Sequence, residues 1–228
     1  MLTRDDLALC ERLDCTFRRP DLLLRALTHR SYSTGHYERL EFLGDSILGA
    51  VIARHLFDAY PALNEGDLSR LRSNLVKEET LALLAQQLGL GPLMRLGEGE
   101  RKSGGSQRVS ILADAMEALF GAVFLDQGYP AAERVVLKLF VPYLAQIDVH
   151  TLGKDPKTLL QEYLQARRLP LPSYRIVTTQ GQAHEQSFLV ECAISAKQLV
   201  TQGQGGSRRN AEQQAAQAAY EQLIATHD

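Results

Sequence analysis

The sequence has few cysteines and no long hydrophobic run. Cys10, Cys15 and Cys192 are the three cysteines among 228 residues, and none belongs to a C-x-x-C pair. Their number and spacing exclude a disulfide framework and give no indication of a zinc or thiol redox site. The first residues lack the apolar segment of a signal peptide, and the most apolar early run, residues 46–57, is too short to span a bilayer. We therefore expect a cytoplasmic protein.

The sequence also lacks an excess of positive charge. Twenty-five Lys and Arg residues stand against 27 Asp and Glu residues, so the formal net charge is -2 and the pI is about 6.3. This balance does not indicate a generally basic surface for nucleic acid, so any such partner must meet locally placed positive charge. The length and the hydrophobic content of 45% are typical of two modest globular domains.

The first part of the chain has helical periodicity throughout. Up to about residue 148, leucines recur at helical spacing, and no stretch shows the alternation of a strand. Residues 97–105 are polar and contain four glycines, which predicts a mobile loop. Helices are expected on its C-terminal side near residues 109–126 and 131–146. We therefore predict an all-α domain over residues 1–148.

The pattern changes in the last third of the chain. An Asp-Pro pair at residues 155–156 predicts the start of a helix that runs to about residue 168. Residues 174–179 and 187–195 alternate as strands do, a shorter strand is expected near 199–201, and residues 210–224 form an alanine-rich helical segment. We predict a multi-domain fold, in which an α-β-β-β-α (α+β) domain over residues 155–228 follows a linker at 149–154.

Three carboxylates in one predicted helix lie on the same side. Glu38, Glu41 and Asp45 are spaced i, i+3, i+7, which places them within a wedge of roughly 60°. The same face continues through Leu48 and Ile52, so the acidic stripe leads into an apolar one. This arrangement predicts carboxylates at the edge of the core rather than on a solvated face.

A second pair of carboxylates stands in an almost uncharged helix. Asp114 and Glu117 are the only charged residues between Ile111 and Leu125, and a helix that is apolar nearly all round is buried. Buried carboxylates tend to take up protons, and two such groups facing each other repel unless cations lie between them. Oxygen-only ligands favour Mg²⁺ or Mn²⁺ over zinc.

An ordinary alternative is that these carboxylates form salt bridges. Arg39, Arg70 and Arg72 are the candidate partners in the sequence. Spacing alone does not decide between the two interpretations.

Four blocks of the sequence, in the same order, resemble signature stretches of the ribonuclease III family. They are THRS at residues 28–31, YERLEFLGDS at 37–46, NEGDLS at 64–69 and SILADAMEAL at 110–119. The resemblance implies a metal-dependent endoribonuclease that hydrolyses double-stranded RNA and leaves 5′-phosphate and 3′-hydroxyl ends. It further implies that ribosomal RNA precursors and structured messenger transcripts are substrates.

The resemblance also implies roles for individual residues. It makes Glu41, Asp45, Asp114 and Glu117 the ligands of Mg²⁺, with Mn²⁺ as a possible substitute, and it makes Asp45, Glu117, Glu38 and Glu65 the catalytic residues. With two cations to activate water and stabilise the leaving oxygen, no Ser or His nucleophile is required, so His29 and Ser46 are expected to be structural. Tyr37 departs from the family, which usually has Asn at this place; the change bears on the shape of the neighbouring cleft.

Phe42 stands between two of the implied metal ligands. Taken alone, an aromatic residue in a helix predicts core packing. In the family the matching aromatic fits a pocket of the partner subunit, so the resemblance implies a homodimer.

The last domain is electrically neutral, with seven basic and seven acidic residues over 155–228. Its distinctive stretch is GQGGSRRNAE at 203–212, which predicts a flexible glycine turn before a helix start. Ser207, Arg208 and Arg209 would join free backbone N–H groups there in an anion site suited to phosphates.

This stretch resembles the last motif of the double-stranded RNA-binding domain, and LQEYLQ at 160–165 resembles its first. The resemblance implies contacts to ribose hydroxyls and base edges from Thr158, Gln161, Glu162, Gln165 and His184. Such a domain spans about 16 base pairs and recognises shape more than sequence. Arg101, Lys102 and Arg108, around the glycine-rich segment, could also touch RNA or simply be solvated.

Two other functions fit parts of the pattern. A catalytically inactive protein that only holds duplex RNA is disfavoured by the intact acids at all four metal positions. An all-helical nucleotide pyrophosphohydrolase also uses paired helical carboxylates on magnesium, but the C-terminal domain would then have no purpose.

Overall fold

The computed structural model describes residues 2–149, 151–152, 154–181 and 186–225. The chain divides into two compact units, Met1–Asp148 and Val149–Asp228. Among the described residues, no helix combines the length and the apolar character needed to cross a membrane.

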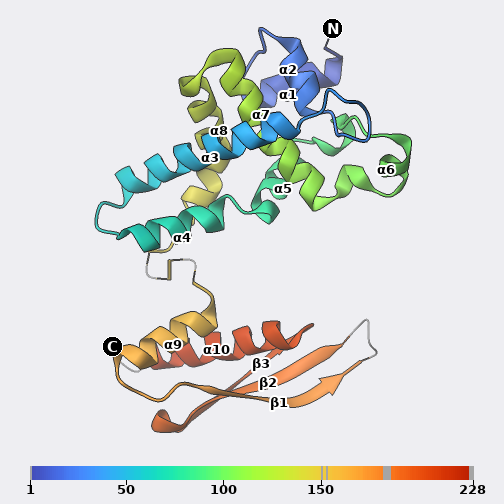
Figure 1. The fold of residues 1–228 in the computed structure, drawn as a ribbon. Coiled ribbons are helices and arrows are strands. Elements are labelled where there is room, and N and C mark those ends of the chain that lie inside the picture. Colours follow the sequence, from blue (N-terminus) through green and yellow to red (C-terminus); the bar gives the residue numbers. More distant parts are fainter. Residues whose placement is uncertain (1, 150, 153, 182–185, 226–228) are drawn as a thin grey trace. The chain divides into compact units, whose positions relative to one another are not determined.

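The first unit is helical, as predicted (Figure 1). Its elements are α1 (Arg4–Leu13), α2 (Pro20–Ala26), α3 (Glu38–Ala59), α4 (Glu65–Leu75), α5 (Glu78–Gln87), η1 (Gly91–Leu93), α6 (Glu98–Lys102), η2 (Gly105–Gln107), α7 (Val109–Gln127) and α8 (Tyr129–Leu144). The helix α7 contributes eleven buried residues and packs against α2, α3, α5 and α8. The prediction that this apolar helix is buried is therefore confirmed.

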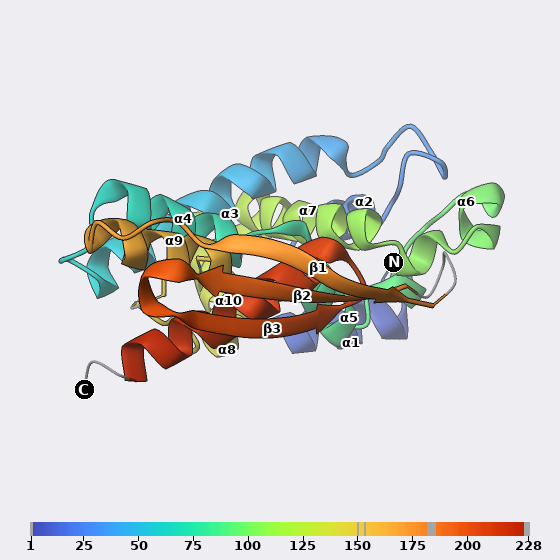
Figure 2. The ribbon, with the colours of Figure 1, turned by 90° about the horizontal axis from the view of Figure 1, so that it is seen from below.

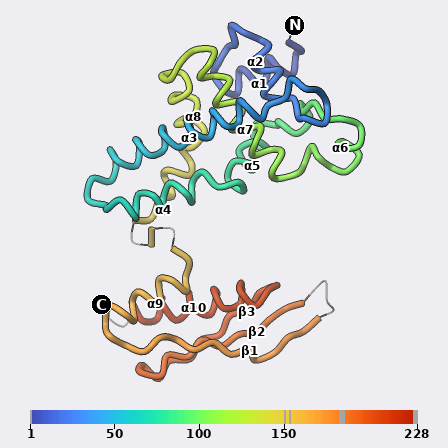
Figure 3. Tube along the Cα trace, in the orientation of Figure 1, coloured from blue at the N-terminus to red at the C-terminus, as the bar shows by residue number. Residues whose placement is uncertain are grey.

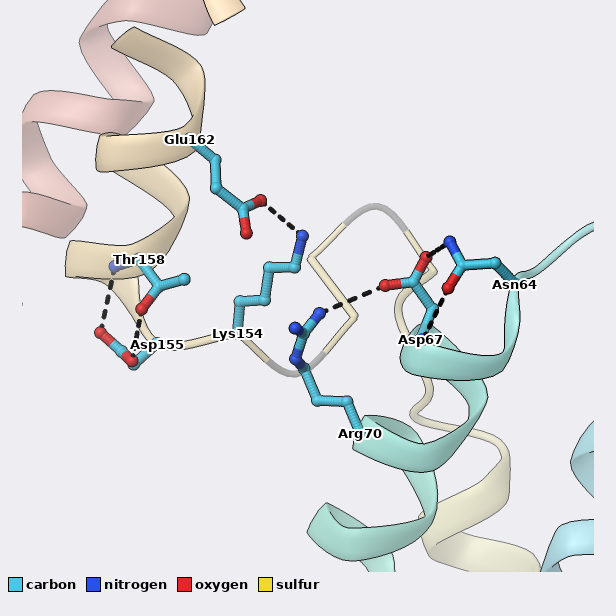
Figure 4. A network of polar contacts seen from close by, with 7 residues as sticks. All are labelled: Asn64, Asp67, Arg70, Lys154, Asp155, Thr158 and Glu162. Carbon is cyan, nitrogen blue, oxygen red and sulfur yellow. Dashed lines mark hydrogen bonds and ion pairs between the residues drawn. The ribbon is translucent and has the colours of Figure 1, made fainter. Parts of the chain in front are cut away.

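The hairpin of α3 and α4 carries most of the predicted acidic residues. The chain turns after α3 and returns along it as α4, as the trace in Figure 3 shows. Asn64 begins α4: its Oδ1 accepts from the Asp67 backbone N–H at 3.1 Å, and its Nδ2 donates to Asp67 Oδ2 at 2.7 Å (Figure 4). Arg70 also pairs with Asp67, at 3.2 Å. This cap holds Glu65 in the first helical turn.

The loop predicted for residues 97–105 is wrong in part, because α6 forms at Glu98–Lys102. Two of the four glycines here, Gly97 and Gly105, serve close packing, whereas Gly104 has a positive φ of 81°. A Cβ added at Gly97 would lie 2.4 Å from the backbone oxygen of Ser31, and one at Gly105 would lie 2.8 Å from that of Glu100. Only glycine fits at such approaches.

The second unit has the predicted α-β-β-β-α order. Its elements are α9 (Pro156–Ala166), β1 (Ser173–Gln180), β2 (Ser187–Ile194), η3 (Ser195–Lys197), β3 (Leu199–Gly205) and α10 (Arg208–Ala225). The strands form an antiparallel sheet in the order β1-β2-β3, seen side by side in Figure 2. The helix α10 packs on β2 and β3 and also against α9. The buried face of β2 contains Val190, Cys192 and Ile194, as its alternation predicts.

The prediction of a glycine turn before the last helix is wrong for its first residues, which belong to a strand. Gly203 and Gly205 belong to β3, which is longer than the predicted 199–201. A Cβ at Gly203 would lie 2.2 Å from the backbone nitrogen of Ala215 in α10, so the glycine permits close strand–helix contact. Ala211, Ala215 and Ala219 are fully buried and provide the smooth helix face that this contact needs.

Candidate active site and RNA interface

A polar hollow of about 640 Å³ opens in the first unit beside the N-terminal ends of α3 and α7. Its walls are formed by His29, Arg30, Ser31, Tyr37, Glu38, Glu41, Glu100, Arg108, Ser110, Ile111 and Asp114. Two of the four predicted metal ligands, Glu41 and Asp114, therefore face one cleft.

Two glycines bring the acidic segments of α3 and α7 together. A Cβ added at Gly44 would lie 1.7 Å from the backbone oxygen of Glu117, and one at Gly121 would lie 2.3 Å from that of Leu40. The helices thus approach until their backbones touch, with Glu41 and Asp45 on either side of Gly44 in the sequence. These glycines were not predicted as site residues, although an isolated glycine inside a helical pattern is the available signal.

The carboxylates are less buried than the sequence predicts. Glu38 and Asp45 are exposed, while Glu41, Asp114 and Glu117 are half-buried. The apolar continuation of the α3 stripe is confirmed, because Leu48 and Ile52 are fully buried. The acids therefore lie where the core meets solvent, and a solvent-borne ligand can reach them.

Burial and mutual repulsion raise the pKa values of two of these groups. Burial, followed by the charges of Asp114, Glu38 and Asp45, raises the pKa of Glu41 to about 7. Burial, followed by the charges of Asp45, Glu41 and Asp114, raises the pKa of Glu117 to about 8. Glu117 is thus affected by the other three members of the predicted ligand set, and Glu41 by two of them, Asp114 and Asp45, together with Glu38. The four carboxylates share one electrostatic site, and a cation there would relieve their repulsion.

The alternative of ordinary salt bridges is not supported for the four predicted ligands. Arg70 pairs with Asp67 instead. In the parts of the chain that the structure describes, no Lys or Arg pairs with any of the four. Glu38 differs, because Arg30 lies 3.4 Å from its carboxylate and His36 lies 3.7 Å from it.

Tyr37 and His29 complete the wall of the cleft. The Tyr37 hydroxyl donates to Asp114 Oδ2 at 3.3 Å. Burial raises the pKa of Asp114, and this hydrogen bond opposes the shift. His29 Nδ1 lies 2.8 Å from Ser31 Oγ, which also accepts from the Gly97 N–H at 2.9 Å. This network supports the structural role expected for His29.

The donor set fits a hard divalent cation. All four predicted ligands offer carboxylate oxygens, the donors that Mg²⁺ and Mn²⁺ prefer. Within the described ranges, no three His, Cys, Asp or Glu side chains converge into a ready-made metal cage. Mg²⁺ rarely needs one, because water and substrate phosphates usually complete a shell begun by one or two carboxylates.

Glu65 is not brought to this cleft. It lies in the first turn of α4, where its Oε1 accepts from Ser69 Oγ at 2.7 Å. It lines a different hollow between α3 and α4, together with Phe57 and Leu68. The cleft also does not include Asp45 or Glu117 among its lining residues.

The predicted RNA-binding residues that the structure describes lie on α9 and at the start of α10. Thr158, Gln161, Glu162 and Gln165 lie on α9, and the last three are exposed. Thr158 bonds to Asp155, which caps the helix (Figure 4). His184 lies outside the described residues.

The start of α10 has a charge arrangement that the sequence did not reveal. Ser207 Oγ accepts from the Asn210 N–H at 3.2 Å. The buried Glu212 pairs with Arg208 at 2.8 Å and with Lys157 of α9 at 2.6 Å. Arg209 is exposed. Lys157 and Glu212 were not predicted as site residues, because their pairing depends on the packing of α9 against α10.

The chain is similar to known proteins over nearly its whole length. Residues 19–144 match the family described as ribonuclease-III-like, and residues 156–223 match the double-stranded RNA binding motif. Ribonuclease 3 of Thiobacillus denitrificans is 61% identical over 218 residues, which cover 96% of each chain. Ribonuclease 3 of Bordetella pertussis is 59% identical over 92% of this chain and 82% of its own.

Solved structures show the same similarity for the first unit. The nuclease domain of ribonuclease III from Campylobacter jejuni is 39% identical with a TM-score of 0.61, over 64% of this chain and all of that chain. A second structure of that domain, described as having structural flexibility in a region involved in dimer formation, gives a TM-score of 0.58 at 40% identity. It covers 59% of this chain and 95% of that chain.

Proposed function

Because this chain belongs to the ribonuclease III family and is an endoribonuclease for double-stranded RNA, we propose that it cuts at a divalent-cation site formed by Glu41, Asp45, Asp114 and Glu117. The observation that carries the proposal is the close approach of α3 and α7 at Gly44 and Gly121, which brings these acids together. There, burial and the charges of neighbouring carboxylates raise the pKa of Glu117 to about 8 and that of Glu41 to about 7. Residues 1–148 would carry the nuclease activity, and residues 155–228 would bind duplex RNA. Residues 149–154 would link the two domains.

Mg²⁺, or Mn²⁺ in its place, would supply activation of water and neutralisation of phosphate charge at this site. The residues of the chain hold the acidic oxygens on α3 and α7 and present Arg30 and Arg108 at the walls of the cleft. Hydrolysis adds the water oxygen to phosphorus and releases the ribose 3′ oxygen with a proton, so the ends are 5′-phosphate and 3′-hydroxyl. Glu38, in the wall of the cleft, belongs to the proposed catalytic set, whereas Glu65 lines a different hollow and is left out of it. Precursors of ribosomal RNA and structured messages are the proposed substrates.

The direct test is incubation of the full chain with long duplex RNA and Mg²⁺, with and without EDTA. We expect shortening of the RNA that EDTA abolishes and that added Mg²⁺ or Mn²⁺ restores. Cutting that continues in excess chelator would contradict the cation site. Retained binding without any cutting would favour the rival function of a protein that only holds duplex RNA.

The carboxylate cluster predicts how pH affects the metal-free protein. The folded pKa of Glu117, about 8, exceeds its ordinary value of 4.5, so the folded state binds the proton more tightly than the unfolded state. This contribution to stability is complete below about pH 4.5 and is lost as pH rises through about 8. In EDTA, we expect the urea concentration at the unfolding midpoint to decrease as the pH is raised from about 6 to about 9. Millimolar Mn²⁺ should reverse this decrease. Glu117→Gln should flatten the dependence, and an equally steep curve would refute this account.

We propose that the RNA interface consists of Thr158, Gln161, Glu162, Gln165 and His184 with the start of α10 at Ser207, Arg208 and Arg209. Free N–H groups of a helix start and exposed arginines suit phosphates. Glu212 already neutralises part of the charge of Arg208, whereas Arg209 is exposed.

Arg209→Gln is therefore expected to weaken duplex binding about three- to tenfold and to reduce the slope of log affinity against log salt by about one. The reason is the loss of one counterion-releasing phosphate contact. Fluorescence anisotropy over a salt series measures both quantities. Lys138→Gln, which removes an exposed charge from α8, is the matched control and should change neither. An Arg209→Gln slope equal to that of the control would exclude the contact.

We also propose that the chain is a homodimer that uses Phe42. This ring is 78% exposed on α3, which a core residue would not be. An exposed aromatic side chain is a typical anchor of a protein interface.

Phe42→Ala is expected to weaken self-association by at least about thirtyfold, as loss of an aromatic anchor does. Analytical ultracentrifugation at micromolar concentration measures the effect. Leu7→Ala, which shortens an apolar side chain on α1 that is also exposed, should leave the dimer intact. A wild-type chain that sediments as a monomer would refute the dimer.

A further inference from the structure

Tyr37 is held rigidly at the start of α3. Its side chain is 2% exposed. Its backbone N–H donates to the Thr28 oxygen at 2.9 Å, and its own carbonyl accepts from Leu40 at 2.7 Å and from Glu41 at 3.0 Å. The residue cannot shift without disturbing the first turn of the helix that carries Glu41.

The Tyr37 side chain reaches from this fixed point to the other acidic helix. Its hydroxyl donates to Asp114 Oδ2 at 3.3 Å, and its ring packs against His29 with centroids 5.8 Å apart. Among the described residues, no other group donates a hydrogen bond to the Asp114 carboxylate. One oxygen of Asp114 is thus engaged by the protein, and the other is left for a ligand.

A half-buried aspartate without a donor would be poorly oriented, because its terminal torsion angle has a broad energy minimum. A donor fixed on another helix selects one orientation of the carboxylate. From this geometry we propose that Tyr37 is a positioning residue, which holds Asp114 in the orientation that binds the divalent cation. The proposal rests on the cation site described under Proposed function and adds a residue that does not itself touch the cation.

Tyr37→Phe tests the proposal, because it removes the hydroxyl and keeps the ring. Loss of a hydrogen-bond partner of a metal ligand typically weakens metal binding at least about tenfold. We expect the dissociation constant of Mn²⁺, measured by titration calorimetry on the full chain without RNA, to rise about tenfold. In cleavage assays the KM for Mg²⁺ should rise by a similar factor, while kcat at saturating Mg²⁺ should stay within about twofold.

Tyr143→Phe is the matched control, because it removes a phenol hydroxyl from α8, where the ring packs on Phe140. It should leave the Mn²⁺ affinity and the KM for Mg²⁺ unchanged. The proposal is overturned if wild-type and Tyr37→Phe chains bind Mn²⁺ equally. It is also overturned if Tyr37→Phe lowers kcat and the unfolding temperature together, because the residue would then be structural. A wild-type chain that binds no Mn²⁺ would refute the cation site itself, which separates the two failures.

Discussion

Glu117→Gln is expected to reduce cleavage of duplex RNA by about a thousandfold or more and to leave duplex binding within about twofold. The substitution keeps the size of the side chain but removes the negative charge that a cation requires. Burial, followed by the charges of the neighbouring acids, raises the pKa of Glu117 to about 8. Single-turnover cleavage with saturating enzyme isolates the chemical step from binding.

The control for this variant is Glu11→Gln, which neutralises an exposed carboxylate on α1. It should cleave at the wild-type rate. Gel-shift titrations in EDTA measure duplex binding, which should persist in both variants because the RNA-binding motif lies in residues 156–223. Wild-type cleavage by Glu117→Gln would remove this residue from the mechanism. Equal loss of binding and cleavage would show that the effect is not chemical.

Gly44→Ala is expected to cost about 3 kcal/mol of stability, because overpacking of this degree forces the backbone to move. The added Cβ would lie 1.7 Å from the backbone oxygen of Glu117, and no side-chain rotation can relieve that contact. The helices α3 and α7 must separate at the level of the acids. Cleavage should therefore fall by about a hundredfold, the usual cost of misplacing catalytic groups by about 1 Å.

Gly49→Ala is the matched control on the same helix. No atom lies within 4 Å of a Cβ added there, so the substitution should stabilise the helix by about 0.5–1 kcal/mol. Urea denaturation followed by circular dichroism gives both values. If the two variants have the same stability, then the close approach at Gly44 does not set the distance between α3 and α7 at the acidic site.

Most elements of the fold could be predicted from the sequence, because their periodicity reflects which face is buried. The apolar stretch of α7 and the alternation of β2 each occur with the expected burial. The errors occurred at glycines, in α6 and at the end of β3. The sequence shows that a glycine is present but not whether it frees the backbone or admits a neighbouring one.

For the site, too, some features could be predicted from the sequence and others could not. The acids Glu41, Asp45, Asp114 and Glu117 were predicted from helical spacing, apolar surroundings and family resemblance, and their metal-binding role stays a prediction. The hydrogen bond from Tyr37 to Asp114 and the pairing of Lys157 with Glu212 join residues 77 and 55 positions apart. No local pattern reports such contacts.

The sequence by itself determined which residues carry carboxylates, and that they stand beside apolar helix faces, because spacing along a helix is a local property. Only the tertiary structure decided that these acids share one field, since this depends on α3 and α7 meeting at Gly44 and Gly121. It likewise decided that Glu65 lines a different hollow. The physical reason is that a pKa responds to burial and to charges that come near only when separate helices pack.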